Sequence, residues 1–142
     1  MAQKIINRFG TLIGWNNITV NVLNRDLEGI DAVSYKDDQE MNNEYGGGKY
    51  PVGQSEGNYT AEASISIFKE ELIALQKSIP KGTRIQDIPA FDFPVVYLYQ
   101  DQMYKDVIRN CRFKNNGVDA KQNDGKIIVQ IDLLCSHIDW NV

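Results

Sequence analysis

Nine residues from Tyr59 to Ile67 alternate without an error between two kinds of side chain. Tyrosine, alanine and isoleucine occupy the odd positions, and small hydroxyl-bearing or acidic residues occupy the even ones: Thr60, Glu62, Ser64 and Ser66. A period of two is that of a β-strand with one buried and one solvated face, and it does not fit the 3.6-residue period of a helix. The pattern therefore predicts a half-buried strand, which requires a sheet around it.

The segment before this strand, from about Asp37 to Gly57, has a different character. It contains five glycines, three of them consecutive, so that ordering it is costly in backbone entropy. About twenty residues is also long for a connection in a compact domain. We expect a long extended loop here, and a β-hairpin that continues the flanking strands is equally compatible with the sequence.

Large side chains that favour burial are scattered through this glycine-rich segment. A loop folded back over its own domain would cover them. Alternatively they would serve as anchors on a neighbouring subunit, since tyrosine is enriched at protein interfaces. We favour the second interpretation and predict an intersubunit arm that includes Met41, Tyr45, Gly46, Gly47, Gly48, Tyr50, Pro51 and Val52.

Period-two patterns dominate the remainder of the chain. They predict strands over about 18–22, 27–36, 93–99, 106–114 and 126–138. In the second of these, Ile30 and Ala32 are expected to lie opposite Val33 and Tyr35. In the fourth, Val107, Arg109, Cys111 and Phe113 are expected to share a face. Pro94 indicates an edge or entry position for the third strand, and the last strand is expected to be central.

One segment changes to helical spacing. In Lys69–Ile79 the apolar residues follow the 3.6-residue period, Glu70 and Glu71 lie in the first turn, and Pro80 follows the end. The apolar stripe is Leu72, Ile73, Leu75 and Ile79. With 142 residues the chain is the size of one domain. We therefore expect a single mainly-β domain over residues 1–142, an antiparallel barrel or sandwich of about six to seven strands. One helix at about 69–79 flanks it, and the long extended loop spans about 37–57.

The composition argues against two classes of function, nucleic-acid binding and membrane insertion. A net charge of −4 and an isoelectric point near 4.9 argue against a domain that grips nucleic-acid phosphates. The same acidity suits a surface past which DNA slides. The longest apolar runs have four or five residues, far fewer than the roughly 20 needed to span a bilayer. The N-terminus lacks the apolar core of a signal peptide. We expect synthesis in the cytoplasm, with no membrane partner.

The sequence contains little that indicates chemistry. His137 is the only histidine and is best explained as a residue at a strand end. Cys111 and Cys135 are expected to be buried free thiols. The run Gly46–Lys49 is followed by Tyr50 and a strand, unlike a phosphate-binding loop. We expect no catalytic, cofactor or metal site and no enzyme activity. The alternative is a small ligand-binding β-barrel or enzyme, which would be monomeric.

The order of these elements resembles that of a known family. An extended strand ends in VSYKDDQEMNNEYG, followed by GGGKYPVG, then GNYTAEASISI and a helix that begins KEEL. This order is similar to that of tail tube proteins of contractile-tailed phages and phage-like elements. These proteins are related in fold to the haemolysin-coregulated tube protein of type VI secretion. The resemblance covers roughly residues 10–142 and is most specific between Tyr35 and Leu75.

The resemblance implies a structural virion protein whose hexameric rings stack into a hollow tube for DNA ejection. Residues 40–57 would be the stacking arm. The face formed by Thr60, Glu62, Ser64 and Ser66, or its equivalent in another strand, would line the lumen. Its partners would be copies of itself and the tail sheath, tape measure, baseplate and terminator proteins, with DNA as passing cargo, in the virion tail. The alternatives within this fold are the tube of a type VI or other contractile injection system, and a terminator or baseplate ring protein.

Overall fold

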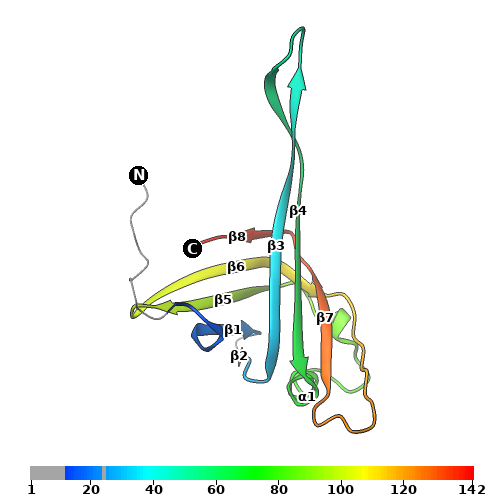
Figure 1. Cartoon of the computed structure of the whole chain (residues 1–142). Coiled ribbons are helices and arrows are strands. Elements are labelled where there is room, and N and C mark those ends of the chain that lie inside the picture. Colours follow the sequence, from blue (N-terminus) through cyan, green and yellow to red (C-terminus); the bar gives the residue numbers. More distant parts are fainter. Residues whose placement is uncertain (1–11, 24) are drawn as a thin grey trace.

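A long β-hairpin dominates the structure. The computed structural model describes residues 12–23 and 25–142. Strands β3 (Ile30–Tyr45) and β4 (Pro51–Phe68) pair antiparallel over their whole length, from Ile30 opposite Ile67 to Tyr45 opposite Pro51. The outer half of the hairpin projects away from all the other strands (Figure 1). The segment expected as a loop over 37–57 is therefore mostly strand, and only residues 46–50 connect the two strands.

The other strands join the hairpin in one antiparallel sheet, in the order β2-β1-β5-β6-β7-β4-β3. A short strand, β8, pairs with β6. The remaining elements are η1 (Trp15–Asn17), β1 (Ile18–Val22), β2 (Arg25–Asp26), α1 (Lys69–Gln76), η2 (Ile85–Asp87), β5 (Phe91–Tyr99), β6 (Gln102–Phe113), β7 (Ile128–Leu134) and β8 (His137–Asp139). The mainly-β antiparallel architecture with one α-helix agrees with the sequence prediction.

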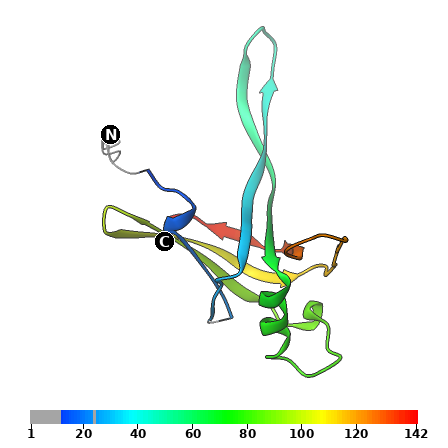
Figure 2. The same cartoon turned by 60° about the horizontal axis from the view of Figure 1, so that its bottom comes forward.

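The sheet bends sharply at β6, because different parts of this strand pair with different neighbours. Its middle pairs with β8, as in Ile108 opposite Ile138, whereas its end pairs with β7, as in Phe113 opposite Leu133. As a result β5 and β6 lie across the direction of β3, β4 and β7, as both views show (Figures 1 and 2). The core fills the angle between the two halves. It is built from fully buried side chains of both: Val20, Ile65, Ile67, Phe93, Val95, Ile108, Val129 and Ile131.

The alternation predicted for β4 is confirmed. Ala63, Ile65 and Ile67 are buried, whereas the even-numbered residues lie on the opposite, solvated face. In β3 the prediction was wrong, because a register shift between Ile30 and Ala32 changes the phase of the strand. Val33 and Tyr35 pack against the core together with Ile30, and Ala32 is exposed. A bulge of this kind inserts one residue and reverses the faces beyond it.

In β6, Val107, Cys111 and Phe113 are buried as predicted, but a second irregularity makes the prediction for Arg109 wrong. The register of β6 with β5 shifts between Phe91 and Phe93, and Asn110 has a φ of 55°. Ile108 is consequently buried beside Val107, while Arg109 is only half-buried. The strand predicted over 126–138 is interrupted after Leu134, so that β7 and β8 are separate strands. As predicted, β7 is central, with β4 on one side and β6 on the other.

Strand β5 is interior, flanked by β1 and β6, so of the edge and entry positions that Pro94 indicated for its start, the edge position is wrong. The β1 ladder ends at the pair Val20–Val95. Pro94 therefore lies just beyond the residues of β5 that pair with β1, where the absence of its N–H is tolerated.

Helix α1 packs against β4 and β7. Leu72 and Leu75 are buried as predicted, but Ile73 is exposed and the helix ends at Gln76. Buried Glu71 accepts a hydrogen bond from the Gly29 amide, with Oε2 at 3.0 Å, and so ties the helix to the turn before β3. No helix in residues 12–23 and 25–142 is long and apolar enough to cross a membrane.

Candidate assembly surfaces

The outer half of the β3–β4 hairpin, residues 39–59, forms an arm. Pairing between β4 and β7 stops at Glu62 opposite Leu134, so beyond that point the two arm strands pair only with each other. Every residue from 40 to 54 is exposed. The large apolar side chains are among the most exposed in the described chain: Met41 64%, Tyr45 64%, Tyr50 73% and Val52 75%. An isolated ribbon cannot bury these side chains, so their burial requires another surface.

All eight residues predicted for the intersubunit arm lie within it. Met41 and Tyr45 belong to β3, Pro51 and Val52 begin β4, and the glycines with Tyr50 form the connecting tip. Gly48 has a φ of 154°, a conformation that side chains disfavour. A register shift between Gln39 and Met41 lies at the inner end of the arm. Such shifts increase strand twist, and the two strands cross there in Figure 1.

The root of the arm is fastened by a set of hydrogen bonds around Asp37. Its Oδ2 atom accepts from the Trp140 indole Nε1 at 2.8 Å and from the Tyr59 hydroxyl at 2.7 Å. The Tyr59 hydroxyl in turn accepts from the Ile138 amide at 3.1 Å. The bond from Trp140, followed by that from Tyr59, lowers the pKa of Asp37 below its usual value. The C-terminal segment therefore holds both arm strands.

A second set of contacts lies deeper, around Tyr35. Its hydroxyl donates to Asp106 Oδ2 at 2.7 Å and also bonds to the Tyr97 hydroxyl. Its ring packs against Trp140, with centroids 5.4 Å apart. Burial, reinforced by the bonds with Tyr97 and Asp106, raises the pKa of Tyr35. Because Asp106 Oδ1 also accepts from the Asn141 amide at 2.9 Å, β3, β5, β6 and the C-terminal segment are joined at one point.

The sequence alone does not reveal that these residues lie together. Asp37 and Trp140 are far apart in the chain, and nothing in a single sequence pairs them. One signal was available: Val33, Tyr35 and Asp37 share a period of two. That period would have placed Asp37 on the inner face of β3, where a carboxylate needs a partner.

The face predicted to line a lumen is the outer face of β3, β4 and β7. Thr60 and Glu62 are exposed there, and Ser64 and Ser66 are half-buried. Ser64 lies between Ser34 and Asp132, and Glu62 lies between Lys36 and Leu134. Lys36 Nζ is 3.9 Å from Glu62 Oε2. Polar side chains from three adjacent strands thus form one continuous surface.

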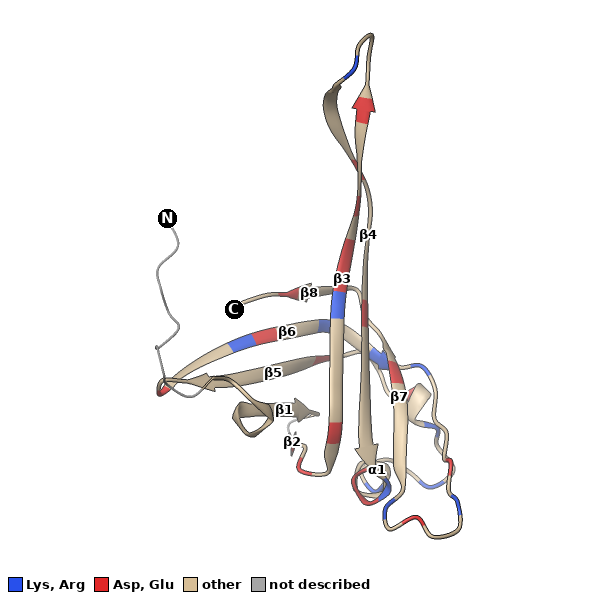
Figure 3. Cartoon of the chain, in the orientation of Figure 1, with Lys and Arg blue, Asp and Glu red and all other residues tan. Residues whose placement is uncertain are grey.

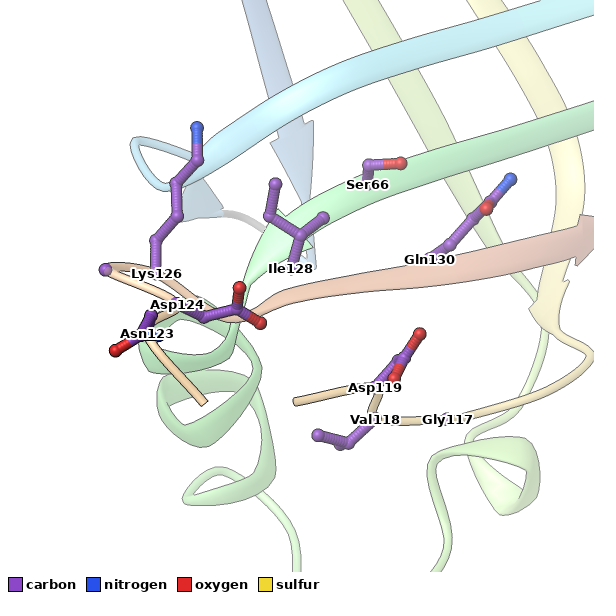
Figure 4. A pocket seen from close by; sticks show the side chains of 10 residues that line it. Ser66, Gly117, Val118, Asp119, Asn123, Asp124, Lys126, Ile128 and Gln130 are labelled. Carbon is purple, nitrogen blue, oxygen red and sulfur yellow. The ribbon is translucent and has the colours of Figure 1, made fainter. Parts of the chain in front are cut away.

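The loop between β6 and β7 borders a hollow of about 720 Å³ beside Ser66 on this face. Its lining comes from β4, β7 and the loop (Figure 4): Ser66, Gly117, Val118, Asp119, Asn123, Asp124, Gly125, Lys126, Ile128 and Gln130. None of these lining residues is a histidine or cysteine. The hollow is open and polar, and its lining does not present a nucleophile beside a base.

His137, Cys111 and Cys135 are not among the residues that line this hollow. The Ser136 hydroxyl is 2.8 Å from His137 Nδ1, but Asp139 Oδ1 is 3.6 Å from Nε2, which is too long for a hydrogen bond. Cys111 and Cys135 are free thiols, as predicted, but only Cys111 is buried, whereas Cys135 is partly exposed. Burial raises the pKa of Cys111 to about 12, so the thiol stays protonated and inert. Within residues 12–23 and 25–142, no three His, Cys, Asp or Glu residues lie close enough to hold a metal ion.

No protein-family model and no curated protein sequence matches this chain. Solved structures do match it in fold. The tube-terminating cap of the anti-feeding prophage superimposes with a TM-score of 0.62 at 13% identity, covering 96% of this chain and 93% of the cap chain. A chain of the extended sheath–tube complex of the extracellular contractile injection system PVC gives 0.62 at 15% identity, covering 94% and 95%.

Hcp1 from Flavobacterium johnsoniae gives a TM-score of 0.50 at 14% identity, covering 86% of this chain and 92% of Hcp1. These alignments span nearly the whole of each partner, so they concern the complete arrangement of strands and not one shared hairpin. The chain therefore has the tail tube protein fold, which it shares with tube, tube-terminator and Hcp proteins of contractile injection systems.

Proposed function

We propose that this protein is a tail tube subunit that assembles into stacked, hexameric rings, and that the resulting tube conducts DNA during ejection. The observation that carries the proposal is the arm. Its large apolar side chains are exposed, whereas its root is fixed by Asp37, Tyr59 and Trp140. A rigidly directed ribbon with unburied anchors is what a subunit needs to reach a neighbour.

The two ends of the sheet support ring formation. β3 is the last strand at one end and β2 is the last at the other. Each therefore presents one side without a strand neighbour within the described chain. Exposed edges of this kind promote pairing with other chains. A contact between different edges of successive subunits closes into a ring when the rotation between them allows it.

The outer face of β3, β4 and β7 supports the lumen assignment. Thr60, Glu62, Ser64 and Ser66 are small or acidic, and the neighbouring segments add Asp38 and Asp132 against Lys36 and Lys114. Such a surface offers little cationic grip to a phosphate backbone, so DNA passes without strong attachment. We assign this face to the lumen of the tube.

In this proposal residues 1–142 form one structural domain without catalytic, cofactor or metal function, located in the virion tail. Its partners are copies of itself and the sheath, tape measure, baseplate and terminator proteins. Two other roles have support from the comparisons. Similarity to the anti-feeding prophage cap favours a terminator, and similarity to Hcp1 favours a tube that passes proteins.

The test is the assembly state of the purified protein, measured by size-exclusion chromatography and negative-stain electron microscopy. A tube subunit is expected to give hexameric rings that polymerise into tubes as concentration rises. A terminator would give single rings at every concentration. A protein that stays monomeric at high concentration, with no rings or tubes in the micrographs, would contradict both roles.

A further inference from the structure

Charge is separated along the hairpin axis of the molecule. Within the arm, residues 39–59, the carboxylates of Glu40, Glu44 and Glu56 are opposed by Lys49, a net charge of −2. At its root, Asp37 accepts hydrogen bonds from Trp140 and Tyr59, and Asp38 Oδ2 is 3.9 Å from Lys36 Nζ. Figure 3 shows acidic residues along the hairpin, and basic residues interspersed with acidic ones around α1 and the loops at the opposite end.

The basic residues include a compact group that follows helix α1. The turn of residues 77–86 contains Lys77, Lys81 and Arg84 and no acidic residue, a net charge of +3. All three side chains are exposed, and none of them forms an ion pair with another residue of the described chain. The turn therefore presents positive charge that its own molecule does not neutralise.

The same turn borders a hollow of about 560 Å³. Its lining includes the apolar Pro80 and Ile85 beside Lys81 and Arg84. The arm offers the matching features, since exposed Tyr50 and Val52 lie at its tip and carboxylates lie along its strands. A mainly polar hollow that also contains Pro80 and basic side chains can receive a tyrosine, whose ring is apolar and whose hydroxyl is polar.

We propose that this basic turn is the docking site for the arm of another copy of the chain in the adjacent ring. The proposal rests on the stacked-ring function argued above and names the surface that the arm contacts. Because the arm and the turn lie at opposite ends of one molecule (Figure 3), a shift along the hairpin axis brings the two together in successive copies. Such a heterologous contact repeats without closing, as a stack requires.

Charge reversal tests the pairing. Arg84→Glu changes the turn and Glu56→Lys changes the arm, where Glu56 is exposed and lies opposite Met41. For each single variant we expect rings to remain and the sedimentable tube fraction at 0.15 M salt to fall roughly fivefold or more, because like charges then face each other. The double variant in one chain restores opposite charges and is expected to recover tubes to within about twofold of wild type.

Lys105→Glu is the matched control, because Lys105 is an exposed residue of β6 outside the turn and the charge change is the same as in Arg84→Glu. It is expected to form tubes like wild type. Circular dichroism of each variant confirms folding. If Arg84→Glu were misfolded, Glu56→Lys alone still decides the matter, because it alters only the arm.

A photo-crosslinking amino acid in place of Tyr50 locates the contact directly. We expect the cross-linked peptide to contain residues 77–86. If both single variants form tubes at the wild-type level, or if residue 50 cross-links to another region, the proposed docking site is refuted and the tube function still stands. Either outcome is expected if the basic turn binds nucleic acid and not the arm. A wild-type protein without rings or tubes would instead refute the tube function itself.

Discussion

The Trp140 indole donates a hydrogen bond of 2.8 Å to Asp37, although the two residues are 103 positions apart in the chain. Asp37 lies in β3 at the root of the arm, and Trp140 follows the last strand, β8. This bond joins the C-terminal segment to β3. The Tyr59 hydroxyl on β4 donates to the same carboxylate, so both strands of the hairpin are held there. The direction of the arm is thus set by residues outside it.

Replacing the indole of Trp140 by a phenyl ring tests how much its hydrogen bond to Asp37 stabilises the protein. Trp140→Phe keeps a ring beside Tyr35 but removes the N–H that Asp37 accepts. We expect the free energy of unfolding to fall by about 0.5–1.5 kcal/mol, the range for one hydrogen bond, and amide exchange to quicken near residues 37 and 59. Urea denaturation and hydrogen exchange measure the two effects. Trp15→Phe, at an exposed tryptophan, is the control; equal losses in both variants would argue against a stabilising hydrogen bond.

The same bonds predict a pH dependence. The pKa of Asp37 is lowered by Trp140 and then by Tyr59, so the ionised carboxylate stabilises the folded state. This stabilisation is fully present above the pKa of the unfolded state and is lost as pH falls through the lower folded pKa. Asp37→Asn removes it, so the stability gap between wild type and variant should be largest near neutrality and shrink in acid. A gap that widened on acidification would contradict the assignment.

Burial in the sheet corner predicts a difference between two residues of β7. Ile131 is fully buried between the two halves of the fold, whereas Leu134 is 57% exposed. Ile131→Ala is expected to lower the free energy of unfolding by about 2–5 kcal/mol, and Leu134→Ala by less than about 1 kcal/mol. Thermal or urea unfolding of the two variants checks this. Similar losses would mean that the core does not lie in the corner.

The two thiols should differ in reactivity. Burial raises the pKa of Cys111 to about 12 and also raises that of Cys135, which is only partly buried. At pH 8 little thiolate is present at either site, and Cys111 is in addition inaccessible to reagents. Alkylation followed by mass spectrometry should label Cys135 slowly and Cys111 only on unfolding. Labelling of Cys111 at the rate of a free thiol in the folded protein would be inconsistent with its position.

The sequence predicted the fold best where local pattern and tertiary environment agree. The alternation of Tyr59–Ile67 places Ala63, Ile65 and Ile67 in the core as expected, because β4 is regular there. Prediction failed in β3 after Ile30 and in β6 at Arg109. Both lie at irregularities of the ladder, and a bulge changes the face of every later residue without a signature in side-chain periodicity.

The arm was predicted as a long extended loop whose large side chains favour burial, whereas most of it is strand. Glycines and polar residues between 37 and 57 weaken any β-pattern, and pairing with the opposite strand supplies the structure that composition does not suggest. The hydrogen bond from Trp140 to Asp37 could not be predicted from the sequence, for a different reason. It depends on the path of the C-terminal segment, which only the complete fold determines.

If the arm stacks one ring upon the next, a protein with a shortened arm should form rings and fail to form tubes. Glu44 lies opposite Gly53, so replacing residues 45–52 by Asn-Gly closes the hairpin with a two-residue turn and leaves the core untouched. Negative-stain microscopy of this variant, at concentrations where wild type forms tubes, should show intact rings and no tubes. Long tubes assembled from the shortened protein would contradict the account.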